Sequence, residues 1–242
     1  MAVRDDDRVT SPRRTTQRRT TRRTLLTGGL AGLAVMSAAC GNGAAPSPPA
    51  GVDGLEIPTP SPEPGDFAEV VDNPWFPLLV GAEWTYRATA GPGRGEIRVQ
   101  ALRGPVRDGI TTTALQRTGP VLGDGAGTSV VDHFAQDVDG NVWWFGRDEE
   151  WFAAPGLAMP ATPRRGDGFV MADSAALAVQ AEVVGLEEAI NVPAGSYSEA
   201  LLLEVVRTTG TTTGTVAQHY VRGIGLVVSG SELLVAHQPP PS

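Results

Sequence analysis

The 242-residue sequence contains no lysine and a single cysteine, Cys40. One cysteine allows no internal disulfide and none of the cysteine clusters that hold structural zinc. The lack of lysine excludes a phosphate-binding loop that ends in Gly-Lys-Ser or Gly-Lys-Thr. Only three histidines occur, His133, His219 and His237, and no two of them have the spacing of a metal pair on one helix. We therefore expect no metal and no cofactor, although histidines on three separate strands could still meet in the fold.

Long apolar runs are also missing. A membrane-spanning helix needs roughly 20 apolar residues, whereas the longest candidate, residues 25–39, is interrupted by Thr27, Gly28 and Gly29. The preceding segment carries eight arginines against three aspartates. A basic front, a short apolar run and small residues at its end are typical of a cleaved export signal. We predict that residues 1–39 are such a signal peptide.

Two adjacent arginines refine this prediction. Arg22 and Arg23, with a leucine pair two residues further on, resemble a twin-arginine export signal. The alternative is a general secretory signal with an arginine-rich front.

The end of the signal peptide resembles a bacterial lipobox, in which a cysteine receives diacylglycerol and becomes the mature N-terminus. The motif is Ser-Ala-Ala-Cys-Gly around Cys40, and Ser37 stands where the pattern usually has leucine. The alternative is an ordinary cleavage site with an unmodified cysteine. We favour lipidation because a lone exposed thiol is a liability in an oxidising compartment. Two acyl chains, at about 0.8 kcal/mol per buried methylene, would anchor Cys40 at the extracytoplasmic face of the cell membrane.

The chain after the signal peptide is strongly acidic. Residues 40–242 contain 11 arginines and 24 aspartates and glutamates, a net charge of −13. Such a charge opposes binding to the phosphate backbone of nucleic acids. We therefore expect no nucleic-acid partner.

Composition divides the mature chain into three parts. Residues 40–65 hold the lipidated cysteine and a proline-rich stretch, which predicts a disordered linker. Residues 66–238 are long enough to form one ordinary hydrophobic core, and we expect a single β-rich globular domain. Residues 239–242 are proline-rich again and predict a disordered tail.

Short runs that alternate apolar and polar residues indicate antiparallel hairpins in the globular part. In the first run, Trp84 and Tyr86 fall on one side and Thr85 and Arg87 on the other. A helix capped by Ser174 competes with a strand over 175–190, and we favour the strand. Three prolines predict an irregular loop over 153–168. The remaining predicted strands are 83–88, 96–102, 110–118, a hairpin over 130–147, 200–208, 213–222, 226–229 and 232–237.

The turn of the hairpin over 130–147 offers the strongest metal candidate. Asp137, Asp139 and Asn141 occupy the first, third and fifth positions of a calcium loop. The sixth position, which requires glycine, is Val142. A tight Asp-Gly turn explains the motif without an ion, so calcium remains a weak alternative.

Five sequence motifs stand out in the globular part: residues 73–78, 81–86, 135–146, 192–197 and 220–227. Together they resemble a widespread, uncharacterised family of exported bacterial proteins. The family itself is similar to the half-barrel folds of lipoprotein carriers, in which a curved antiparallel sheet surrounds a helix or an apolar ligand. The resemblance implies a mainly β fold with one strongly curved antiparallel sheet, a half-barrel or open barrel with at most one or two short helices.

A group of aromatic residues is the main candidate for a ligand pocket. Trp143, Trp144, Phe145 and Trp151 could line a pocket for a lipid, or they could fill the core. No Gly-x-Ser-x-Gly nucleophile motif occurs, so a hydrolase is only a residual hypothesis. We expect a membrane-anchored, non-enzymatic structural or interaction module of the cell envelope, whose partner is an envelope protein. The alternative is a carrier of a lipid or other hydrophobic small molecule.

Overall fold

The computed structural model describes residues 63–91, 94–120 and 128–241. The export-signal arginines Arg22 and Arg23, the lipidation site Cys40 and the linker up to residue 62 lie outside the described residues. In the described part of the chain, no helix has the length and hydropathy needed to cross a membrane. A short 3-10 turn, Pro64–Asp66, precedes the strands.

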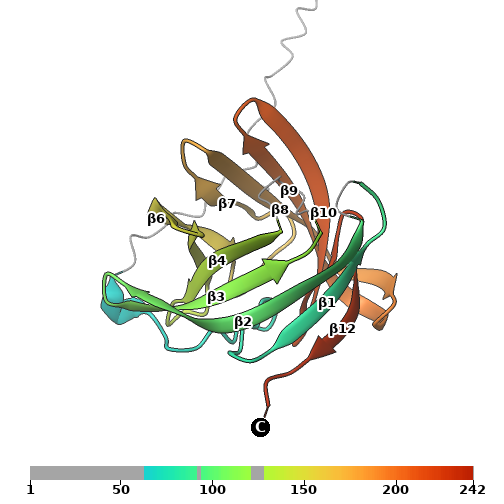
Figure 1. The fold of residues 1–242 in the computed structure, drawn as a ribbon, viewed down its shortest axis with the longest axis horizontal. Helices are drawn as coiled ribbons and strands as arrows, with labels where there is room; N and C mark the ends of the chain where they lie inside the picture. The colour runs from blue at the N-terminus through green and yellow to red at the C-terminus, as the bar shows by residue number, and fades with distance from the viewer. Residues whose placement is uncertain (1–62, 92–93, 121–127, 242) are drawn as a thin grey trace, which may run out of the picture. The chain divides into compact units, whose positions relative to one another are not determined.

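The fold is a single antiparallel sheet of 12 strands, which confirms the predicted mainly β class (Figure 1). The strands are β1 (Glu83–Ala88), β2 (Gly95–Arg107), β3 (Ile110–Thr118), β4 (Ser129–Gln136), β5 (Val142–Arg147), β6 (Glu150–Met159), β7 (Gly168–Asp173), β8 (Leu177–Val192), β9 (Gly195–Thr209), β10 (Thr212–Val221), β11 (Gly225–Ser229) and β12 (Glu232–Gln238).

The sheet curls into a nearly closed barrel. The order β6-β5-β4-β3-β2-β1-β12-β11-β10-β9-β8-β7 means that each strand pairs with its sequence neighbours, except at one place. The first and last strands, β1 and β12, pair with each other, so the unpaired edges belong to β6 and β7. These two edges meet without a ladder: Gly156 in β6 lies directly against the backbone carbonyl of Met171 in β7. We call this contact the seam.

The alternation of apolar and polar residues along the strands identifies the face of the sheet that lines the barrel interior. Trp84 and Tyr86 in β1 pair with Val99 and Ile97 in β2, and all four side chains are buried. Because residues directly opposite each other in a ladder share a face, this apolar face lines the inside of the barrel. Arg87, on the other face of β1, is exposed.

One end of the barrel is closed by the segment that precedes β1. Phe76 from this segment contacts Phe134 and Tyr220, with ring centroids 5.2 and 6.0 Å apart. Asn73 holds the segment in place. Its side-chain amide donates to the carbonyls of Gly140 and Pro160, at 2.8 and 3.1 Å.

The same asparagine also organises its own turn. The Asn73 side-chain oxygen accepts the N–H groups of Trp75 and Phe76, at 2.8 and 3.2 Å. The motif Asn-Pro-Trp-Phe-Pro-Leu is therefore a plug that seals this closed end.

One sequence prediction about the strands is wrong. The expected irregular loop over residues 153–168 is wrong for residues 153–159, which belong to strand β6, whereas residues 160–167 connect β6 to β7 as a loop. Pro155, the one of the three prolines that lies in β6, is tolerated because β6 is an edge strand and its pairing with β5 is interrupted at this residue. The strand preferred over a helix for 175–190 is confirmed by β8.

Candidate functional site

The end of the barrel opposite the plug is formed by the turns of the β5–β6, β7–β8, β9–β10 and β11–β12 hairpins. We call this end the mouth. Deeper in the barrel, the inward positions are apolar, as in Leu201, Leu203 and Val205 of β9. Towards the mouth, the positions on this same inward face of the sheet are occupied by charged residues. They are Arg117, Asp132, Arg147, Arg207 and Glu232.

Arg117 and Glu232 form an ion pair inside the barrel. Arg117 in β3 donates to Glu232 in β12 at 2.7 Å, and both side chains are more than four-fifths buried. The Arg117 guanidinium also lies 5.9 Å from the centre of the Tyr86 ring. Burial raises the pKa of Tyr86 well above its ordinary range, and the positive charge of Arg117 opposes that rise. The pair spans β3 and β12, two strands that are not neighbours in the sheet.

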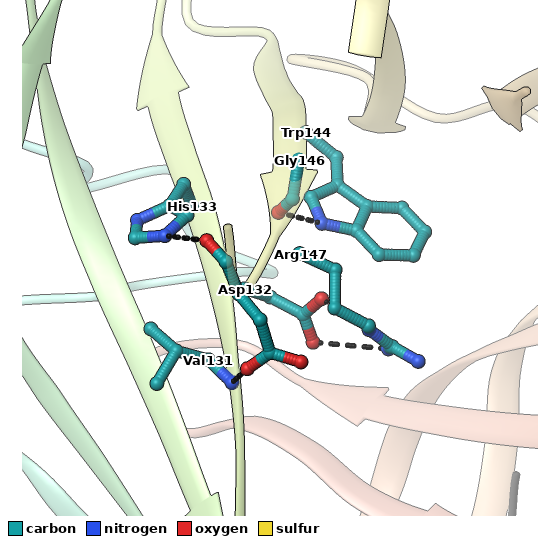
Figure 2. Close-up of polar contacts among 7 residues, drawn as sticks. Val131, Asp132, His133, Trp144, Gly146 and Arg147 are labelled. Carbon is teal, nitrogen blue, oxygen red and sulfur yellow. Dashed lines mark hydrogen bonds and ion pairs between the residues drawn. The ribbon is translucent and has the colours of Figure 1, made fainter. Parts of the chain in front are cut away.

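A second ion pair lies in the barrel wall beside the mouth (Figure 2). Arg147 in β5 donates to both carboxylate oxygens of Asp132 in β4, at 2.8 and 3.1 Å. The Arg147 guanidinium also lies 5.2 Å from the centre of the Trp144 ring. A two-pronged contact of this kind fixes the orientation of the guanidinium plane.

The turn after β5 is tied to the neighbouring strand by Asp148. Its carboxylate accepts the N–H of Val131 at 2.8 Å, and its own N–H donates to the Val131 carbonyl. Its carbonyl lies 3.2 Å from Nε2 of His133. Asp148 adopts a positive φ of 52°, a conformation that aspartate tolerates better than most residues. These contacts hold the rim of the mouth.

A cavity of about 400 Å³ lies at the mouth. Its apolar wall is formed by Phe152 and Leu177, and its polar wall by Arg147 and Arg207. Three acidic residues of the β5–β6 turn complete the rim: Asp148, Glu149 and Glu150. Cavities of a few hundred Å³ with mixed walls are the usual size of a small-molecule site.

The predicted aromatic pocket is divided by the structure. Trp143 and Trp144 are both buried, and they line neither the mouth cavity nor the second cavity described below. Trp143 donates its indole N–H to Asp137 at 2.8 Å, and Trp144 contacts Phe152 at 5.1 Å between ring centroids. They face opposite sides of β5, because Trp144 pairs with Phe134 and Trp143 with the next residue.

The other two aromatic candidates lie together on the outside of the barrel. Phe145 and Trp151 line a second cavity of about 310 Å³, formed also by Phe152 and Pro155. Two of the four predicted pocket residues, Phe145 and Trp151, therefore line a cavity, and none of the four lines the mouth cavity.

In the candidate calcium loop, the carboxylate of Asp137 already accepts hydrogen bonds from the protein. The Asp137 carboxylate accepts the backbone and side-chain N–H groups of Asn141, at 2.8 and 2.9 Å, as well as the indole of Trp143. Asp139 takes no part in these bonds. Among the described residues, no group of three or more His, Cys, Asp or Glu side chains is arranged to hold a metal ion.

The three histidines have separate neighbours. The ring of His133 stacks on Trp151, with centroids 4.7 Å apart, and Figure 2 shows it on the opposite side from Arg147. His237 stacks on Trp84 at 5.3 Å. Burial lowers the pKa of both His219 and His237, which favours their neutral forms.

The arginines of the mouth have a signal in the sequence, which is their spacing relative to the buried apolar residues of the same strands. Arg207 continues the two-residue phase of Leu201, Leu203 and Val205, and Arg117 follows Leu115 in the same way. An arginine in phase with a buried apolar face indicates a charge inside the barrel. The family resemblance stays a prediction. The chain matches no protein-family model, no curated protein and no solved structure.

Proposed function

We propose that this protein is a membrane-anchored extracytoplasmic lipoprotein whose barrel binds a small hydrophobic or amphiphilic molecule at its mouth. The anchor rests on the sequence alone, through the export signal and the acylated Cys40. The binding role rests on the 400 Å³ cavity between Phe152 and Leu177. In this role the protein holds or carries its ligand and performs no chemistry on it.

The cavity suits an amphiphile because its walls differ in character. Phe152 and Leu177 supply apolar surface, and burying an apolar group against such surface contributes about 25 cal/mol per Å². Arg147 and the acidic rim supply polar contacts near the opening. The Asp132 carboxylate holds Arg147 in one orientation, so this part of the wall is ordered before a ligand arrives.

A second candidate function is a structural or interaction module of the envelope. The observation in its favour is the filled interior below the mouth, where Phe76, Phe134 and Tyr220 pack ring against ring. A module of this kind would use its outer surface, and its mouth cavity would bind nothing.

Native mass spectrometry and a cavity-filling variant separate the two candidates. The full-length chain carrying Cys40→Ser cannot be acylated at position 40 and can be incubated with dodecylphosphocholine. We expect a one-to-one complex that Leu177→Trp abolishes, because the indole would occupy the cavity. Leu186→Trp is the matched control, since Leu186 is also half-buried in β8 but lines neither cavity. Absence of any complex, or an equal loss in both variants, would rule out the binding role.

A further inference from the structure

The second cavity lies directly behind the first. It sits on the outer side of the wall, between the β2–β3 hairpin and β6, and has a volume of about 310 Å³. Ile110, Phe145, Trp151 and Pro155 give it an apolar lining. Phe152 lines both this outer cavity and the mouth cavity.

The wall between the two cavities is interrupted. In the β5–β6 ladder, Gly146 pairs with Trp151 and Trp144 pairs with Gly156. One residue of β5 therefore faces four residues of β6, the segment 152–155, which has no ladder partner in β5. The neighbouring seam adds a second unpaired edge, because β6 and β7 share no ladder. Segment 152–155 therefore has no ladder partner in β5 or in β7.

Among the residues that line the two cavities, only Phe152 is common to both. Its ring meets Trp144 edge to face, with centroids 5.1 Å apart and an interplanar angle of 77°. The side chain is only half-buried, and Ala153 and Ala154 beside it are exposed. A half-buried ring in a strand segment without ladder partners can change rotamer more easily than a ring of the packed core.

Both openings carry charges of both signs. At the mouth, Arg147 and Arg207 accompany Asp148, Glu149 and Glu150. At the outer cavity, Arg107 lies 3.2 Å from Asp108. The three carboxylates at the mouth outnumber its two arginines, so they oppose a purely anionic head group and favour a head group that also carries a positive charge.

We propose that the ligand is a single-chain zwitterionic amphiphile, and that its chain extends from the mouth cavity past Phe152 into the outer cavity. This inference rests on the proposed binding function. Phe152 is then the residue that sets the longest chain the protein accepts. Two adjoining cavities that share Phe152 favour an elongated chain over a compact ring system.

A chain-length series tests this assignment. Alkylphosphocholines with 8 to 16 carbons are titrated, each below its critical micelle concentration, against the full-length Cys40→Ser chain and its variants. While a chain is still entering apolar space, each methylene should tighten binding about fourfold. With Phe152→Ala, the affinity of the 14- and 16-carbon probes relative to that of the 8-carbon probe should rise at least tenfold over the same ratio in the parent chain.

Two further variants complete the test. Ala153→Trp fills the outer cavity from an exposed position, so it should weaken only the long probes. Tyr197→Ala removes a half-buried ring that lines neither cavity and should leave the whole series unchanged. If the probes bind but Phe152→Ala and Ala153→Trp leave the chain-length dependence unchanged, the passage is refuted and the mouth site stands. If no probe binds at any length, the binding function itself is refuted.

Discussion

Asn73 provides the sharpest test of how the barrel is closed. The side chain is 1% exposed and takes part in four hydrogen bonds, two as donor and two as acceptor. Asn73→Ala would leave the carbonyls of Gly140 and Pro160 and the N–H of Trp75 without these partners. The Phe76 N–H would keep the Asn73 backbone carbonyl, 3.0 Å away.

The expected cost follows from these three abandoned groups. Leaving one buried polar group unsatisfied costs about 1–3 kcal/mol, and neighbouring groups do not add fully. We expect the free energy of unfolding to fall by about 3–5 kcal/mol, a large share of the roughly 5–15 kcal/mol typical of a domain. In thermal unfolding the midpoint should fall by about 10 °C for a domain of this size.

Urea unfolding followed by tryptophan fluorescence measures this loss. The midpoint should shift while the slope of the transition stays constant, since the surface exposed on unfolding is unchanged. Asn191→Ala is the matched control, because Asn191 is exposed and should change stability by less than about 0.5 kcal/mol. A loss below about 1 kcal/mol for Asn73→Ala would refute the idea that this residue fastens the plug.

Three further predictions concern the seam and the buried titratable groups. Gly156→Ala should cost about 1–3 kcal/mol in urea unfolding, because the added methyl would overlap the Met171 carbonyl across the seam; wild-type stability would contradict the close contact. Burial raises the pKa of Tyr86 and Tyr220 well above the ordinary value of 10, so neither should contribute phenolate absorbance at 295 nm below pH ~12 until denaturant is added, and stability should fall as the pH rises above 10. Burial lowers the pKa of His237 below its ordinary value of 6.5, so the unfolded chain binds the proton more readily and stability should fall as the pH drops through 6.5. His237→Gln should flatten that part of the pH profile, and an unchanged slope would argue against it.

Much of the sheet could be predicted because its signals are local. The alternation around Trp84 and Tyr86 identifies β1, and the Asp-Gly turn identifies the β4–β5 hairpin. Strand β6 was missed because its proline and glycine content resembles a loop. Only the edge position next to the seam makes that composition compatible with a strand.

The closure of the barrel and the mouth depend on contacts between distant parts of the chain. No local pattern reports that β1 pairs with β12, since Trp84 and His237 are 153 residues apart. The ion pair of Arg117 with Glu232 depends on that closure, and so does the space enclosed beside Phe152. The two-residue spacing of the arginines from buried apolar residues is visible in the sequence, but the residues with which they pair are not.

The position of the seam has a consequence for the integrity of the chain. Exposed Arg164 and Arg165 lie in the connection between β6 and β7, the one pair of consecutive strands that shares no ladder. A trypsin-like protease cutting after either arginine would break the covalent backbone and leave every strand pairing in place. The two halves of the cut chain, with six strands each, would stay hydrogen-bonded to each other through β1 and β12. We therefore expect that a cut between β6 and β7 leaves the two halves of the barrel associated.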